Sequence, residues 1–162
     1  MGMYENVNDI VKKFYHDDHL LRLLYYPPTN YSTILDPLDP SLENVIDIDE
    51  EWSIRDERIL LVPKTNDLED NPLCRVYLYA GRRTPTGNYQ VAKQEIIVDI
   101  VCHSDFEKDL RSMRISDRIN ELLFNERITG VGKIDYVGGG QISVPSNYVG
   151  YSHRYVFGST KS

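Results

Sequence analysis

Two clusters of histidine and acidic side chains contain the residue types that bind metal ions. HDDH at residues 16–19 places His16 and His19 three positions apart, so both imidazoles would share one face of a helix. The spacing differs from the i, i+4 pair of HExxH, and no second cluster supplies further ligands. The acids within residues 47–57 lack the EF-hand pattern, with its central glycine and terminal glutamate. We therefore expect two solvated polar surfaces, with no metal ion and no other cofactor.

Glycine-rich and nucleophile motifs give no catalytic site either. TGVGK at residues 129–133 matches part of a phosphate loop, but GxxxxGK[ST] needs a hydroxyl after the lysine, and Ile134 stands there. A glycine turn explains this stretch, and Gly138–Gly140 is interpreted as flexible or bulged hairpin geometry. The sequence contains no GxSxG, and neither His103 nor His153 has a suggestive Ser or Cys partner, although a spatial triad stays open. We expect a protein that is not an enzyme.

Length and charge place the chain among soluble globular proteins. It has 162 residues, 41% hydrophobic and 27% charged, which predicts one domain with a real core. Of its net charge of −7, residues 36–70 carry twelve acids against three bases, a balance of −9, which leaves +2 for the rest. An acidic protein is a poor candidate for binding nucleic acid. The sequence shows neither a membrane-spanning apolar run nor a signal-peptide core, so we expect a cytoplasmic protein.

The two cysteines, Cys74 and Cys102, each lie in an apolar, strand-like run. This placement favours two buried free thiols in a reducing compartment over a metal site. A disulfide between neighbouring strands stays open as the alternative.

The first part of the chain divides into a helix and a long polar segment. Apolar residues recur at helical spacing from Val7 onward until Pro27–Pro28, which predicts one helix over residues 1–26. Residues 27–71 are acidic and rich in proline, and we expect a long insertion with short elements at most, including a short strand at Arg58–Val62. An excursion of this length is often functional or ordered by a partner.

The remainder predicts a sheet and a second helix. Residues 73–80 and 89–103 alternate like strands and should form an antiparallel hairpin with an extended tip at RRTPTGN. SDFE at 104–107 is a capping-box pattern before a helix over 108–124, and KIDYVGG, QISVP and residues 148–157 are strand-like. The fold class is therefore α+β, a single domain whose four-stranded, mainly antiparallel sheet is packed by two helices. Residues 72–158 form its core and 159–162 a tail.

The order of these elements resembles that of tail-terminator and tail-completion proteins of long-tailed bacteriophages, with the lambda tail-terminator fold as the nearest architecture. The stretches IIVDIVCH, RISDRINELL, ITGVGKI and YVGYSHRYVFG carry the resemblance. It implies a virion protein, assembled in the host cytoplasm, that forms a homo-oligomeric and usually hexameric ring. The ring would end polymerisation of the tail tube and join the tube to the head connector or stopper protein. DNA would pass its channel without specific binding.

The resemblance also gives the extended hairpin a role. Arg82, Arg83 and Tyr89 would lie on an arm that reaches a neighbouring subunit, at its acidic 36–70 segment. Twelve tyrosines and one tryptophan add contact area. We therefore expect Trp52, Tyr148 and Tyr151 in subunit or partner interfaces, with a merely mobile loop as the alternative for the arm. The alternative for Trp52 is that it anchors segment 27–71 to the body of its own subunit.

Other functions stay open. The chain could be a head-completion or stopper protein, or a tail-tube subunit. From other classes, it could be a metal-dependent hydrolase or nuclease, or an adaptor that binds a host protein through its acidic segment.

Overall fold

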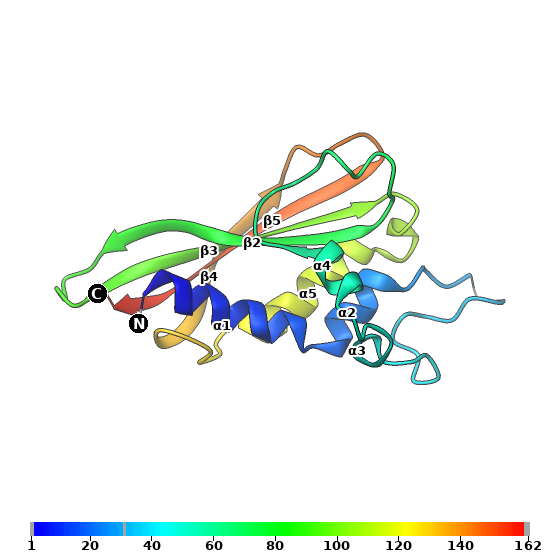
Figure 1. Ribbon diagram of the computed structural model, residues 1–162. Coiled ribbons are helices and arrows are strands. Elements are labelled where there is room, and N and C mark those ends of the chain that lie inside the picture. Colours follow the sequence, from blue (N-terminus) through cyan, green and yellow to red (C-terminus); the bar gives the residue numbers. More distant parts are fainter. Residues whose placement is uncertain (1, 31, 161–162) are drawn as a thin grey trace.

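The computed structural model describes residues 2–30 and 32–160 as an α+β fold, with the helices on one face of a five-stranded sheet (Figure 1). The helices are α1 (Met3–Tyr15), α2 (Asp18–Tyr25), α3 (Val45–Ile48), α4 (Ser53–Arg58) and α5 (Arg111–Leu123), and η1 (Glu107–Asp109) is a 3-10 turn. The strands are β1 (Ile59–Leu60), β2 (Cys74–Pro85), β3 (Val91–His103), β4 (Val131–Gln141) and β5 (Tyr148–Thr160). Their order in the sheet is β1-β2-β3-β5-β4.

The sheet differs from the predicted one in the number and direction of its strands. It has five strands and is mixed, because β1 pairs in parallel with β2 while the other pairs are antiparallel. Of the two runs predicted around Gly138–Gly140, KIDYVGG lies within β4, whose pairing with β5 shifts register between Tyr136 and Gly138. The second run, QISVP, is a loop except for Gln141, the last residue of β4. Gly138 has a φ of +156°, and a Cβ on Gly139 would lie 2.7 Å from the carbonyl oxygen of Ser152. These glycines therefore accommodate a bulge within a strand.

The predicted N-terminal helix is two helices, which break at HDDH. Asp17 is extended, with φ of −99° and ψ of 102°, and its carboxylate accepts a hydrogen bond from the Leu20 backbone N–H at 2.9 Å. Aspartate is a favoured N-cap because its side chain satisfies such a donor. The apolar pattern continues across the break, since Phe14 and Leu20 are both fully buried.

The predicted capping box before α5 is also wrong. The helix begins at Arg111, and its N-cap is Leu110, which has a left-handed φ of 57°. The Glu107 carboxylate reaches forward and accepts from the Ser112 backbone N–H at 2.6 Å. The first turn of α5 is thus capped by the side chain of Glu107, which binds the Ser112 N–H instead of the Ser104 N–H that the capping box predicts.

The core lies between the helices and the inner face of the sheet. The predicted alternation is confirmed on β3, where Ile96, Val98, Ile100 and Cys102 all face this core. Cys74 lies opposite Cys102 in the β2–β3 register, and both are buried free thiols. On the opposite face, loops 61–73 and 142–147 arch over one end of the sheet (Figure 1). A smaller cluster lies under them, formed by Leu68, Leu73, Tyr77 and Val101.

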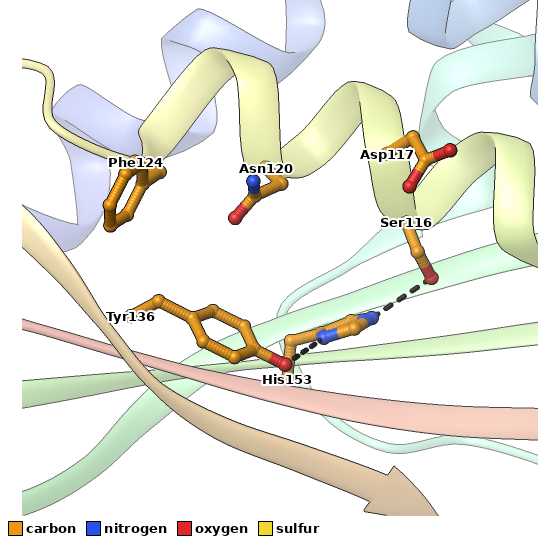
Figure 2. A pocket seen from close by; sticks show the side chains of 6 residues that line it. All are labelled: Ser116, Asp117, Asn120, Phe124, Tyr136 and His153. Carbon is orange, nitrogen blue, oxygen red and sulfur yellow. Dashed lines mark hydrogen bonds between the residues drawn. The ribbon is translucent and has the colours of Figure 1, made fainter.

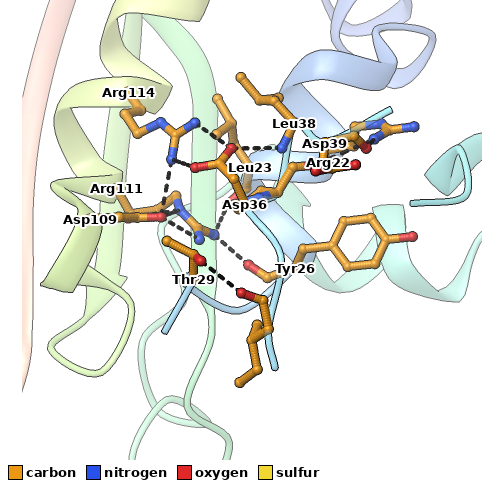
Figure 3. Close-up of polar contacts among 12 residues, drawn as sticks. Arg22, Leu23, Tyr26, Thr29, Asp36, Leu38, Asp39, Asp109, Arg111 and Arg114 are labelled. Carbon is orange, nitrogen blue, oxygen red and sulfur yellow. Dashed lines mark hydrogen bonds and ion pairs between the residues drawn. The ribbon is translucent and has the colours of Figure 1, made fainter. Parts of the chain in front are cut away.

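Segment 27–71 contains α3, α4 and β1, and arginines attach it to the body. The Arg22 guanidinium donates to the carbonyl oxygens of Asp39 and Leu42, each at 2.8 Å. Asp67 forms an ion pair with Arg75 on β2, and Asp36 forms one with Arg114 on α5 (Figure 3). Part of the acidic charge of this segment is therefore compensated within the chain.

Candidate functional site

The extended hairpin, residues 80–93, is called the arm below. Its tip lies at the end of the molecule where both termini lie (Figure 1). Tyr89 at the tip is 80% exposed, the largest fraction among the described large hydrophobic side chains, and Arg82 is exposed. The Arg83 guanidinium instead donates to Gln94 Oε1, Ser159 Oγ and the Thr160 carbonyl oxygen. Of the two arginines, Arg82 is therefore the one presented to solvent.

The other predicted interface residues lie away from the arm. Trp52 has a left-handed φ of 64°, and its ring lies 3.6 Å from the Arg55 guanidinium carbon, with Tyr15 and His16 at its edges. Trp52 therefore attaches segment 27–71 to the body. The Tyr148 hydroxyl donates to the Leu68 carbonyl oxygen at 2.7 Å. The structure does not bring the six predicted residues together in one place.

A groove runs between α5 and the strands β4 and β5 (Figure 2). Its first hollow, of 360 Å³, is lined by Ser116, Asp117, Asn120, Phe124, Tyr136 and His153. A second hollow, of 440 Å³, shares three of these residues and adds Glu107, Ser112, Met113, Gln141, Val149, Gly150 and Tyr151. We call the two hollows together the α5 groove. Tyr151, predicted as an interface residue, is the one member of that set that lies in it.

His153 is at the centre of the groove and bridges two hydroxyl groups. Its Nε2 lies 2.9 Å from Ser116 Oγ and its Nδ1 lies 2.8 Å from the Tyr136 hydroxyl (Figure 2). Burial lowers the pKa of His153, and the carboxylate of Asp117 opposes this shift. The imidazole is therefore neutral near pH 7, with one nitrogen donating and the other accepting, in either tautomer.

The Ser116–His153 pair has the residue types of a nucleophile and a base. Ser116 lies within α5, however, so the backbone N–H groups beside it belong to the helix and are not free to bind an oxyanion. This geometry favours a binding surface over acyl transfer. The sequence reasoning missed the pair because its members are 37 positions apart. Strand alternation gave a signal, since Tyr151, His153 and Tyr155 fall on one face of β5.

The walls of the groove combine aromatic and acidic side chains. Met113 on α5 is 60% exposed, and Phe124, the C-cap of that helix, is 47% exposed. Asp117 and Glu107 supply negative charge, and no lysine or arginine among the described residues lines either hollow. The groove can therefore bind a group that is both apolar and positively charged.

Acids of the two motifs considered for metal binding form structural contacts. Asp17 pairs with Arg118 at 2.6 Å, and Asp18 pairs with Arg22 at 2.6 Å. Asp49 accepts from the Ile54 N–H at 2.8 Å and pairs with buried Arg55. Within residues 2–30 and 32–160, no three His, Cys, Asp or Glu residues lie where they could hold a metal ion. In that same part of the chain, no helix has the length and apolar character that crossing a membrane requires.

Comparison with known proteins gives two matches. A family model described as YomW matches residues 17–157. The SPbeta prophage-derived uncharacterized protein YomW of Bacillus subtilis (strain 168) is 31% identical over 170 residues, covering 97% of this chain and 97% of that protein. The chain is therefore similar to a prophage-derived protein along nearly its whole length.

Proposed function

Because this chain belongs to the YomW family, which includes a prophage-derived protein, we propose that it is a structural protein of a phage particle. Copies of the chain form a hexameric ring at the head-proximal end of the tail tube. The ring ends polymerisation of the tube and joins it to the head connector or stopper protein. The protein is assembled in the host cytoplasm, becomes part of the virion and catalyses no reaction.

The arm is the observation that carries this proposal. Its turn, between β2 and β3, contains the 80% exposed aromatic side chain of Tyr89. This turn lies at one end of the molecule, beyond the helices that cover the sheet (Figure 1). An exposed tyrosine on a projecting hairpin is typical of a protein contact, since it provides apolar area with a polar tip. A contact made by one end of a subunit to a different surface of the next is heterologous, and such contacts close into rings.

The charge of the chain fits a ring through which DNA passes. A net charge of −7 gives the subunit little attraction for the phosphate backbone. DNA in the channel would be repelled rather than held. Tight binding of duplex DNA at physiological salt would contradict this part of the proposal.

The test is assembly. Analytical ultracentrifugation and negative-stain imaging of the purified protein, alone and mixed with tail tubes, should show closed rings and tubes capped at one end. Growth into long tubes would identify a tube subunit instead. Rings that bind the head connector but not the tube end would identify a stopper. A protein that stays monomeric at high concentration and leaves tube ends uncapped would overturn the proposal.

Two variants test whether ring assembly depends on the arm. Tyr89→Ser should abolish rings while leaving the circular dichroism spectrum unchanged, because the side chain has few contacts to lose within its own subunit. Val62→Ser is the control, since Val62 is 66% exposed and follows β1, which pairs with β2 near the start of that strand and away from the arm. Equal assembly of the two variants would show that the arm is not the contact.

A further inference from the structure

We propose that the α5 groove binds the tip of the arm of a second copy of this chain. This inference rests on the proposed function and names the two surfaces that would meet in the ring. The groove replaces segment 36–70 as the expected contact of the arm, because four of that segment's acids already form ion pairs within the chain: Asp36, Asp49, Glu57 and Asp67.

The side chains at the two surfaces match. Phe124 and Tyr136 form aromatic walls at one end of the groove, and the polar groups of Ser116 and His153 lie beside them (Figure 2). Tyr89 carries an aromatic ring and a hydroxyl. The ring can stack on the aromatic walls, and the hydroxyl can donate a hydrogen bond to the polar groups or accept one from them. Aromatic side chains in such pockets often provide most of the binding energy of an interface.

The charges at the two surfaces are opposite. The arm exposes Arg82 and Lys93. The groove exposes Asp117 and contains Glu107, and no basic residue lines it in the described part of the chain. Attraction between these groups would orient two subunits before the tyrosine is buried.

The tip is held in shape before any contact forms. The Thr86 hydroxyl donates to the Val91 carbonyl oxygen at 2.6 Å, and the Gln90 N–H donates to Asn88 Oδ1 at 2.9 Å. A preorganised tip loses less entropy on binding. Since the groove is lined by residues of α5, β4, β5 and their neighbours, and by none of the arm, the contact joins two different surfaces of two subunits.

Cross-linking tests the contact directly. Tyr89→Cys combined with Asn120→Cys should give a ladder of covalent oligomers on a non-reducing gel after mild oxidation, ending at the ring size. Native Cys74 and Cys102 are fully buried and should not contribute. The control is Val62→Cys with Asn120→Cys, which places one exposed thiol after β1, away from the arm, and should give no ladder above the level of the single variants.

Charge reversal gives a second test. Arg82→Glu should weaken association by about tenfold, and Asp117→Lys in the same chain should restore it, because the repelling pair becomes attractive again. Rings of the parent protein without a ladder above the control would overturn the groove contact and leave the proposed function standing. A ladder that stops at the dimer, with no rings, would support the contact and overturn the ring.

Discussion

The carboxylate of Asp36 accepts two hydrogen bonds from the guanidinium of Arg114, each 3.0 Å long, across 78 positions of sequence. The contact holds segment 27–71 against α5, on the helix that also forms one wall of the groove. The Arg114 hydrogen bonds lower the pKa of Asp36, and Asp36 in turn raises the pKa of Arg114. Arg22 and Arg111 support the same region by donating to backbone carbonyl oxygens (Figure 3).

Asp36→Asn should loosen this segment without unfolding the protein. The pair is partly exposed, with side-chain exposures of 26% for Arg114 and 42% for Asp36, so its loss should lower the free energy of unfolding by only about 0.5–1 kcal/mol. Amide exchange in residues 32–44 should become faster, because fewer contacts hold them. Asp47→Asn, at an exposed acid of the same segment, is the control. Equal exchange rates in both variants would contradict a tethering role.

Asp67 should lower the free energy of unfolding of the protein as the pH falls into the acid range. The hydrogen bonds from Arg75, at 2.8 and 2.9 Å, lower the pKa of Asp67 from 3.8 to about 2. A lowered pKa in the folded state stabilises the fold above the ordinary pKa, and this contribution is lost as pH falls from about 4 to about 2.

Asp67→Asn should therefore cost on the order of 1 kcal/mol near pH 7, a value reduced for the 34% exposure of the carboxylate, and nearly nothing at pH 2. Urea unfolding of both proteins between pH 7 and pH 2 measures the difference. Glu69→Gln, at a neighbouring exposed acid, is the control. If the free energies of unfolding of Asp67→Asn and the parent differ by the same amount at every pH in this range, the ion pair is not the source of the difference.

The sequence predicted the elements that depend on regular spacing. The inner face of β3 and the body of α5 follow from apolar residues at periods of two and 3.6, and both are present. The alternation of β5 was equally readable, but only packing against α5 brings His153 to Ser116. The missed features depend on which partner a polar side chain binds, and the spacing of residues in the sequence does not show this. Asp17 interrupts the predicted helix by capping α2, although the apolar pattern continues across it. Arg83 donates to the Thr160 carbonyl oxygen at the end of β5 and is therefore not directed to solvent.

Segment 27–71 shows why composition predicted less there. Its prolines and acids indicated a long excursion, and the short strand predicted at Arg58–Val62 is present as β1, Ile59–Leu60. The two short helices were not predicted, and arginine contacts hold them in place. Arg55, for example, is buried by Trp52, Asp49 and the Tyr15 carbonyl oxygen together. Such a contact set joins residues 40 positions apart and has no local sequence pattern. A bulge at Gly138–Gly140 was among the expected geometries, but the sequence did not show that β4 continues through it, because a glycine run is equally compatible with a turn.

Arg111→Met should be among the most destabilising single changes in the protein. The guanidinium is fully buried and donates to the carbonyl oxygens of Leu23 and Tyr26, at 2.7 and 2.6 Å, and to the Asp109 carboxylate. Methionine fills a similar volume but leaves these acceptors unpaired, which costs about 3–5 kcal/mol.

Arg114→Met on the same helix is the matched control for this change. Its ion pairs are partly exposed, so urea unfolding should show a loss of about 1 kcal/mol or less. Similar urea midpoints for the two variants would mean that the buried contacts of Arg111 contribute no more to the free energy of unfolding than a surface ion pair does.

Gly130, just before β4, and Gly132, within β4, allow the cost of backbone strain to be measured apart from that of a steric clash. Both have left-handed φ values, of +67° and +79°, so an alanine at either position is strained by about 1 kcal/mol. A Cβ on Gly130 would also lie 2.1 Å from the Gly158 carbonyl oxygen, whereas a Cβ on Gly132 meets open space. Gly130→Ala must therefore push β5 away from the start of β4, and its free energy of unfolding should fall by about 2 kcal/mol more than that of Gly132→Ala. Thermal and urea unfolding of the two variants measures this difference, and equal losses would show that β4 and β5 do not approach each other this closely at Gly158.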